Sequence, residues 1–204
     1  MITRRAVWAA ALIAAVAPPL QATGATGAGT PDAIVSAFYD ALLVTMKDGP
    51  TIGFNGRSER LGPAIRRAFD LPLMTRLMVG PQWNGLTAEQ QRQLVAAFSE
   101  FSVATYASRF DDYSGERFEV DPTPTSTTNG VIVHTKLLKT DGEAVQLDYL
   151  MRQSDAGWQI IDVYLSGTLS ELATRRSEFS AVMRRGGADA LVDALQKKAA
   201  QLGG

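Results

Sequence analysis

The fold of this chain is decided by residues 157–179, which read GWQIIDVYLSGTLSELATRRSEF. The first nine of these residues are rich in aromatic and β-branched types, which favour a half-buried strand. A Ser-Gly pair ends the strand. Thr168 and Glu171 then stand at the spacing of a capping box, in which each side chain satisfies an amide at the start of a helix. The stretch therefore predicts a strand that is followed directly by a capped helix.

The first 29 residues have the pattern of a secretory signal peptide. They contain no acidic residue, and Arg4 and Arg5 precede an apolar run from Ala6 to Ala17 and a segment of small residues. This run is shorter than the ~20 residues that a bilayer-spanning helix needs, so an uncleaved anchor is the less favoured interpretation. We expect residues 1–29 to be removed on export and residues 30–204 to form a single domain.

Composition excludes several classes of site. The chain has no cysteine, which rules out a lipidated N-terminal cysteine, disulfides, thiol catalysis and cysteine metal sites. The signal holds two of the 20 basic residues and none of the 21 acidic ones, so the mature charge is 18 − 21 = −3. With no basic cluster, nucleic-acid binding is poorly supported. One histidine without cysteine disfavours a zinc or copper site, and we expect no metal and no cofactor.

The segment before residue 115 is predicted to be helical. Thr30-Pro31-Asp32 starts a helix that Gly49-Pro50 ends, and a flexible segment follows at 51–59. Two shorter helices are expected at 61–69 and about 73–78. A capping box of Thr87 and Gln90 opens a long helix that extends to about Phe110. Its apolar arc is wider than a normal core stripe, so we expect cover on two sides.

After Gly115 the apolar period becomes two, which is typical of strands. Strands are predicted at 118–120, 129–139, 144–153 and 157–165, with a loop at Pro122 and Pro124. A C-terminal helix follows, and Gly186-Gly187 interrupts it. The predicted fold is α+β: a four-stranded antiparallel meander sheet packed against N- and C-terminal helices, enclosing an apolar pocket.

The register of the meander suggests a polar row. Asp141-Gly142, taken as a two-residue hairpin turn, places His134 opposite Tyr149. A four-residue loop before the last strand places Tyr149 opposite Asp162. One interpretation is catalytic, because burial can retune a carboxyl or an imidazole. The other is a satisfied polar network, and we favour it because a lone histidine among apolar neighbours is more often structural.

Seven residues in the decisive stretch match a known pattern: a Gly-Trp, a strand that ends in Asp-Val, a turn with a glycine, and a helix with an arginine before an aromatic residue. They are Gly157, Trp158, Asp162, Val163, Gly167, Arg176 and Phe179. On these residues the chain resembles the Mla-type, toluene-tolerance family of periplasmic lipid-transport proteins. The likeness extends into the N-terminal half at Phe69-Asp70, Met74, Gly80, Trp83, Leu86, residues 89–91, Phe98 and Tyr106.

Within that family, the chain is most similar to the hopanoid-biosynthesis-associated branch. Three segments carry this likeness: FNGRSERLGPAI (54–65), FDLPLMTRLMVGPQW (69–83) and TYASRFDDYSGERFEV (105–120). The phospholipid carriers of enteric bacteria differ in the loop from Asn55 to Arg60. The resemblance therefore leaves two lipid classes open, phospholipid and hopanoid.

The resemblance implies a soluble, unanchored periplasmic carrier that moves a lipid between inner and outer membranes. Such a carrier docks on an inner-membrane ABC-type complex and on an outer-membrane lipoprotein complex, and it performs no covalent chemistry. The expected lipid-binding residues lie on two helices and the apolar sheet face. They are Leu73, Met74, Leu77, Met78, Phe98, Phe101, Tyr106, Val145, Leu147, Tyr149, Met151, Ile160 and Tyr164.

Two alternatives stay open at this point. One is an isomerase- or dehydratase-like enzyme that acts on a small hydrophobic substrate through Asp162, His134 and Tyr149. The other is a periplasmic adaptor that binds only protein. Arg57, Arg60, Arg175 and Arg176 are candidates for contacts with headgroups or partners, although exposed arginines are more often simply solvated.

Overall fold

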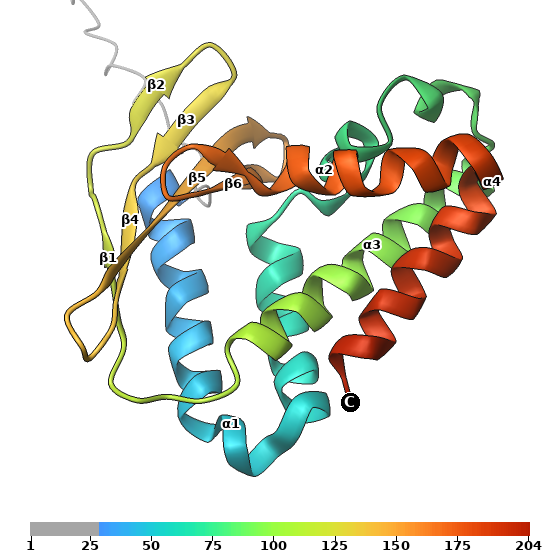
Figure 1. The fold of residues 1–204 in the computed structure, drawn as a ribbon. Helices are drawn as coiled ribbons and strands as arrows, with labels where there is room; N and C mark the ends of the chain where they lie inside the picture. The colour runs from blue at the N-terminus through green and yellow to red at the C-terminus, as the bar shows by residue number, and fades with distance from the viewer. Residues whose placement is uncertain (1–28) are drawn as a thin grey trace, which may run out of the picture.

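The computed structural model describes residues 29–204, so the predicted signal peptide lies, except for Gly29, outside the described residues. The helices are α1 (Pro31–Ala68), α2 (Leu71–Val79), the short 3₁₀ helix η1 (Gly80–Gly85), α3 (Ala88–Arg109) and α4 (Glu171–Leu202). The strands are β1 (Arg117–Val120), β2 (Thr125–Thr127), β3 (Gly130–Val133), β4 (Thr135–Leu138), β5 (Ala144–Ser154), β6 (Gly157–Leu165) and β7 (Leu169–Ser170). One antiparallel sheet packs against helices from both ends of the chain, which confirms the α+β class (Figure 1).

The expected flexible segment at 51–59 is wrong, because these residues are helical apart from Gly53, whose φ is 63°. Element α1 consists of two helices joined across a kink at Gly53, so the first helix passes Gly49-Pro50 before the chain turns back and continues to Ala68 (Figure 1). The buried Arg57 holds this region in place, because its Nε donates to the carbonyl of Ala107 at 2.8 Å and its Nη1 donates to the carbonyl of Gly49 at 3.0 Å. Arg57 is therefore a structural link between α1 and α3.

The predicted start of α3 is confirmed in atomic detail. The Thr87 hydroxyl accepts a hydrogen bond from the Gln90 amide at 3.2 Å, and the Gln90 side chain accepts one from the Thr87 amide at 3.1 Å. This reciprocal pair satisfies two of the amides that a helix start leaves without partners. The helix buries Leu94, Phe98 and Phe101 along one face, as the helical period of these residues predicts.

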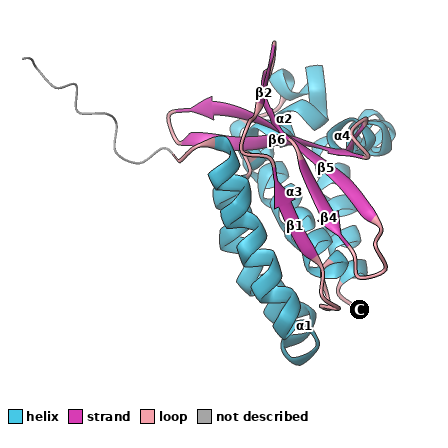
Figure 2. Cartoon of the chain, turned by 90° about the vertical axis from the view of Figure 1, so that its left-hand side faces the viewer, coloured by secondary structure: helices cyan, strands magenta, loops and turns pink. Residues whose placement is uncertain are grey.

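The sheet has seven strands rather than the predicted four. Strand β2 lies in the segment that was predicted to be a loop, just after Pro124. The strand predicted over 129–139 is divided at His134 into β3 and β4, which both pair with β5. β1 flanks β4, β2 flanks β3, and β6 pairs with the other edge of β5. The four predicted strands thus correspond to β1, β3 with β4, β5 and β6, and β2 and β7 were not predicted (Figure 2).

The turn between β4 and β5 differs from the prediction by one residue. The amide of Lys139 donates to the carbonyl of Glu143 at 2.8 Å, so the loop has three residues and ends at Gly142, whose φ is 88°. Three-residue hairpin loops end with a residue in this left-handed region, which glycine adopts without strain. A slip of one residue exchanges the two faces of the sheet. Tyr149 therefore lies opposite Val133 and not opposite His134.

Helix α4 starts from a different cap than predicted. The hydroxyl of Ser170 accepts a hydrogen bond from the amide of Ala173 at 2.9 Å, and Glu171 is the first helical residue, so the proposed pair of Thr168 and Glu171 is wrong. The expected interruption at Gly186-Gly187 is confirmed, because Gly187 has a φ of 69° inside the helix. The second half of α4 runs beside α3 (Figure 1).

The core lies between the sheet and the helices. Its fully buried side chains come from α1, α3, α4 and the two central strands, and include Leu42, Ile65, Leu94, Met151, Ile160 and Leu195. Closely packed side chains exclude water from this layer. Towards the start of α4 the same layer is incompletely filled, and the candidate site lies there.

Candidate functional site

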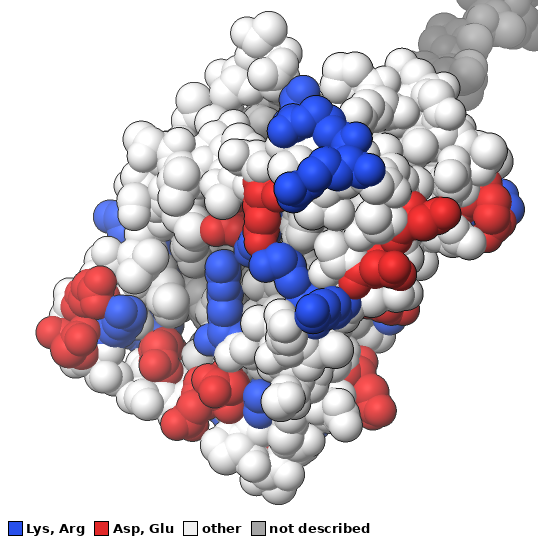
Figure 3. Space-filling view, turned by 45° about the vertical axis from the view of Figure 1, so that its right-hand side comes forward, with Lys and Arg blue, Asp and Glu red and all other residues white. Residues whose placement is uncertain are grey.

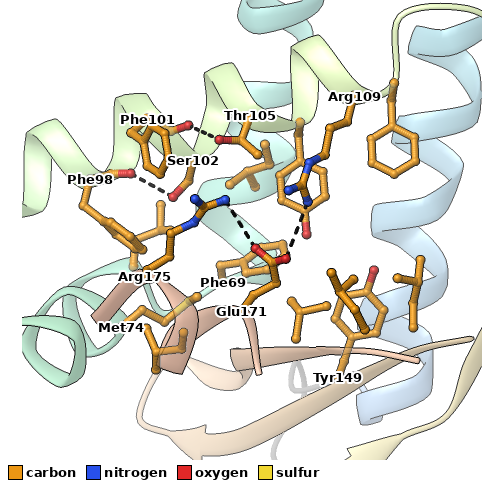
Figure 4. A pocket seen from close by; sticks show the side chains of 18 of the residues that line it. Phe69, Met74, Phe98, Phe101, Ser102, Thr105, Arg109, Tyr149, Glu171 and Arg175 are labelled. Carbon is orange, nitrogen blue, oxygen red and sulfur yellow. Dashed lines mark hydrogen bonds and ion pairs between the residues drawn. The ribbon is translucent and has the colours of Figure 1, made fainter. Parts of the chain in front are cut away.

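A cavity of about 220 Å³ opens between the sheet and helices α2, α3 and α4 (Figure 4). It is lined by Ile65, Phe69, Leu71, Met74, Phe98, Phe101, Ser102, Thr105, Tyr106, Arg109, Phe110, Leu137, Val145, Leu147, Tyr149, Val163, Leu165, Glu171, Leu172 and Arg175. Most of these side chains are aliphatic or aromatic. The cavity therefore offers a hydrocarbon-like interior in which few polar groups are available to orient a ligand.

The helix α3 supplies the wall opposite the sheet. Phe98, Phe101 and Thr105 recur at intervals of three and four residues, so they share one face of the helix. The hydroxyl of Ser102 donates to the carbonyl of Phe98, and that of Thr105 donates to the carbonyl of Phe101, each at 2.8 Å. Because both hydroxyl protons are held by the helix's own backbone, this wall behaves as an apolar surface.

Two tyrosines, Tyr106 and Tyr149, line the cavity, and Tyr39 packs against Tyr149 with its ring centre 5.7 Å away; burial favours the neutral form of all three. Burial raises the pKa of Tyr39 to about 12 and also raises the pKa values of Tyr106 and Tyr149 above the ordinary value of 10.0. The Tyr39 hydroxyl lies 2.6 Å from that of Thr135. Tyr149 extends from β5 towards the cavity in Figure 4. An uncharged phenol can donate one hydrogen bond at low desolvation cost, so this part of the cavity tolerates both hydrocarbon and a hydroxyl or carbonyl group.

The charged residues that line the cavity, within residues 29–204, are Arg109, Glu171 and Arg175. Arg175 Nη2 lies 3.3 Å from Glu171 Oε2, and Arg109 Nη1 lies 3.9 Å from Glu171 Oε1. Figure 4 shows the carboxylate of Glu171 between the two guanidinium groups. Since Arg109 is half exposed, at 51%, this group of charges marks the side on which the cavity meets solvent.

The charged rim continues along α4. Arg175 Nη1 lies 3.0 Å from Glu178 Oε2, and Lys198 Nζ lies 2.6 Å from Glu178 Oε1. Burial raises the pKa of Glu178, but hydrogen bonds from Lys198 and Arg175 outweigh that effect and hold the pKa below its usual value. The Arg175 guanidinium also lies 5.0 Å from the centre of the Phe101 ring, a cation–π geometry. Arg175 is thus fixed in direction by three neighbours.

Seven of the thirteen residues predicted to bind lipid line the cavity: Met74, Phe98, Phe101, Tyr106, Val145, Leu147 and Tyr149. The other six do not. Met78, Met151 and Ile160 are packed in the solid core, and Leu77 is 40% exposed. Leu73 and Tyr164 are half-buried and lie outside the cavity lining.

The predicted row of His134, Tyr149 and Asp162 does not exist. Tyr149 points to the inner face of the sheet. Asp148 is its neighbour on β5, so the Asp148 side chain points to the opposite face. His134 lies on that opposite face, because its Nδ1 is 3.1 Å from Asp148 Oδ2. Asp162 lies opposite Leu150, because a bulge between Leu150 and Met151 shifts the register. The three side chains therefore cannot act on one substrate.

Asp162 has a structural role instead. Its Oδ1 accepts hydrogen bonds from the amides of Val163 at 2.8 Å and Leu172 at 3.0 Å, and its Oδ2 accepts one from the Ser170 hydroxyl at 2.5 Å. The carboxylate thereby binds the first turn of α4, where a negative charge is favourable. Asp162 is one of the seven residues on which the family resemblance was based. Its role is to fix the start of α4, the helix that borders the cavity.

Of the ionic rim, the sequence analysis named only Arg175, as one of the arginines that could contact a headgroup or a partner; it missed Arg109, the pairing of Glu171 with Arg175 and several apolar residues of the lining. Arg109 follows a long apolar helix and looked like an ordinary exposed residue, whereas Glu171 and Arg175 stand at i,i+4 spacing, which is a readable signal for an ion pair. Leu137 was missed because the predicted hairpin register was off by one residue, and Val163 was missed because the bulge between Leu150 and Met151 was not predicted.

Other kinds of site find little support in the part of the chain that the structure describes. No group of three or more His, Cys, Asp or Glu side chains there could hold a metal ion. Among residues 29–204 no helix has both the length and the apolar character to cross a bilayer. On the face drawn in Figure 3, basic and acidic side chains are interspersed, with one compact group of Lys and Arg near its upper edge.

Comparison with known proteins agrees with this geometry. A family model described as MlaC protein matches residues 36–197. Among solved structures, the chain is similar to a phospholipid-binding protein from Ralstonia solanacearum, solved in complex with a phospholipid at 1.53 Å resolution. The two chains share 27% sequence identity over 85% of this chain and 99% of that chain, with a TM-score of 0.73. No curated protein matches the chain.

Proposed function

The chain belongs to the MlaC family, and from that premise we propose that it is a periplasmic carrier that shelters the acyl chains of a membrane lipid in its apolar cavity. The observation that carries the proposal is the cavity itself, which is lined mainly by hydrocarbon and opens beside a charged rim. A lipid has the same division between tails and headgroup. The similar protein from Ralstonia solanacearum, which was solved with a phospholipid, supports the same assignment.

The physical need for such a cavity is simple. A two-tailed lipid carries about thirty methylenes, and each costs ~0.8 kcal/mol when it is exposed to water. Free diffusion across an aqueous compartment is therefore opposed by roughly 20 kcal/mol or more. Transfer from one apolar phase to another is nearly neutral, so a carrier only has to match the interior of the membrane. The carrier needs an apolar surface of sufficient area and a shape that fits the acyl chains, and it needs no catalytic group.

The volume of the cavity sets a condition on loading. An engineered apolar cavity of about 150 Å³ admits a single benzene molecule, so a cavity of about 220 Å³ is smaller than two acyl chains require. We propose that the walls separate when lipid enters. The sheet forms one wall and α3 with α4 forms the other, and between residues 29 and 204 no disulfide ties the two together.

We further propose that the protein is exported through the predicted signal peptide and works as a soluble, non-enzymatic shuttle that helps to maintain the outer membrane. In this proposal it exchanges lipid with an inner-membrane ABC-type complex and with an outer-membrane lipoprotein complex. Its cargo is a phospholipid or a hopanoid. These partners, the cargo and the single lipid-binding domain at 30–204 are expected from the family resemblance.

The decisive experiment is native mass spectrometry of the protein purified without detergent. We expect a fraction of the protein to carry a bound mass, which solvent extraction identifies as a phospholipid or a hopanoid. Lipid-free protein should then take up the same lipid from vesicles and deliver it to acceptor vesicles. Protein that never carries extractable lipid and cannot be loaded with either class would show that the proposal is wrong.

A further inference from the structure

We propose that the rim of the cavity binds the phosphodiester group of a lipid between the guanidinium groups of Arg109 and Arg175. The inference rests on the proposed carrier function and deepens it, because it assigns the two residues that distinguish a lipid with a phosphate from a neutral lipid. A lipid with a phosphate is then preferred to a neutral lipid with the same tails.

The first argument is the arrangement around Glu171. Arg109 comes from the last turn of α3 and Arg175 from the second turn of α4, yet each lies against a different oxygen of the same carboxylate, at 3.9 and 3.3 Å. The position between the two guanidinium groups is thus suited to an anion with several oxygens. A phosphodiester has this shape, and arginine binds it with two parallel hydrogen bonds.

The second argument is a groove that leads outward from this position. A hollow of about 200 Å³ is lined by Phe101, Thr105, Arg109, Arg175, Lys198, Gln201 and Leu202, and it shares the first four of these residues with the cavity. A single lipid could therefore place its tails in the cavity and its headgroup in the groove. The groove adds the donors of Lys198 and Gln201 to those of the two arginines.

The third argument is the balance of charge. Three cations, Arg109, Arg175 and Lys198, face two carboxylates, Glu171 and Glu178, which leaves 3 − 2 = +1. Arg109 is the least engaged of these cations. Its side chain is 51% exposed, and its distance of 3.9 Å from Glu171 exceeds hydrogen-bond range.

The two arginines have different roles in this site. Arg175 is held by two carboxylates and by the ring of Phe101, so its direction is set before a ligand arrives. Arg109 can turn from Glu171 to the phosphate. Glu171 is then the internal competitor of the ligand, and its carboxylate limits the affinity of the site.

The test is a competition between dioleoylphosphatidylglycerol and dioleoylglycerol, which have the same tails. The purified lipid-free protein is mixed with vesicles that contain both, and the bound ratio is read by native mass spectrometry. We expect the wild type to prefer the phospholipid. Arg109→Gln with Arg175→Gln should lower this preference about tenfold or more, because charge-assisted contacts are lost.

Matched controls separate this site from a general effect of charge. Arg92→Gln with Arg184→Gln removes the same charge from the same two helices, at exposed positions outside the cavity and groove, and should leave the ratio unchanged. Arg109→Gln alone is a second test if the double variant folds poorly, because the Arg109 side chain is half exposed. Glu171→Gln should raise the preference, since it removes the competing carboxylate.

The outcomes distinguish this inference from the proposed function. If the wild type binds both lipids equally, or if the arginine variants keep its ratio, the phosphodiester site is wrong while the carrier remains. If the wild type binds neither lipid, the carrier function fails and the site fails with it. Inorganic phosphate that binds lipid-free protein as tightly as phosphatidylglycerol does would assign the site to free phosphate and overturn the headgroup site.

Discussion

The carboxylate of Asp162 in strand β6 accepts a hydrogen bond from the backbone amide of Leu172 in helix α4, at 3.0 Å. Leu172 lines the cavity, and Asp162 is buried beside it. Because the same carboxylate also accepts from Val163 and Ser170, one side chain fixes the angle at which α4 leaves the sheet. The shape of the cavity on this side depends on that angle.

Replacement of Asp162 by Ala should therefore destabilise the protein. It leaves two amides and one hydroxyl without their acceptor, and we expect the free energy of unfolding to fall by about 3 kcal/mol. Asp162→Asn, which keeps one acceptor oxygen, should cost about 1 kcal/mol. Urea unfolding measures both, and a change below about 0.5 kcal/mol in the Ala variant would contradict this role.

Replacement of Ser102 by Trp should reduce lipid loading, because Ser102 lines the cavity and an indole would occupy much of the space. Ser99→Trp is the matched control. Ser99 lies one turn away on α3, is half-buried in the same way, and its hydroxyl also donates to the backbone four residues earlier, but it faces a different hollow.

The measurement is the fraction of protein that carries lipid after incubation with phospholipid vesicles. We expect a loss of about tenfold for Ser102→Trp and little change for Ser99→Trp. Equal losses in both variants would indicate a general packing defect and not a blocked cavity.

Replacement of His134 by Ala should leave lipid transfer near the wild-type level. His134 lies against Asp148 and, at 3.1 Å, against the hydroxyl of Thr125, on the face of the sheet opposite to the cavity. A general acid–base enzyme that relied on this imidazole would lose about 10²–10⁴-fold in rate. Vesicle-to-vesicle transfer of a fluorescent phospholipid checks this directly, and a loss of that size would favour the catalytic alternative.

Alkaline solution should unfold the protein more readily than its composition suggests. Burial raises the pKa of Tyr39 from 10.0 to about 12 and raises those of Tyr106 and Tyr149 as well. In the unfolded chain these phenols lose their protons near pH 10, so the unfolded state binds fewer protons above that pH. The stability that the neutral tyrosines contribute is fully present below pH 10 and is lost as the pH rises from 10 towards 12.

Each of the three buried phenols should lower the free energy of unfolding by about 1.4 kcal/mol per pH unit in this window. Urea unfolding at about pH 9 and about pH 11 measures the total. Tyr39→Phe should remove roughly a third of the slope. Stability that is the same at both pH values would contradict the burial of these groups.

The helices could be predicted from the sequence where local chemistry decides the structure. The capping box of Thr87 and Gln90 depends on side chains three residues apart, and the structure contains both of its hydrogen bonds. The same reasoning failed at Gly49-Pro50, because a tertiary contact dominates there. A Cβ at Gly49 would lie 2.2 Å from the carbonyl oxygen of Asp111, just after α3, and Arg57 donates to the carbonyls of Gly49 and, in α3, of Ala107, so α3 and the loop after it hold this part of α1 in place.

The sheet was harder to predict because one residue in a turn decides which side chains share a face. Asp141-Gly142 is compatible with a two-residue and a three-residue loop, and only the longer loop forms. That difference of one residue separates His134 from Tyr149. The cavity residues on helices were accordingly predicted better than the polar row on the strands, since the helical period does not depend on a turn.

The small volume of the cavity matters most for a carrier that returns without cargo. A permanent apolar cavity wide enough for two acyl chains would either hold water molecules that make few hydrogen bonds or bind an apolar surface of another protein. With only about 220 Å³ between its walls, the lipid-free protein exposes little apolar surface to water. An empty carrier of this shape would therefore have little tendency to aggregate.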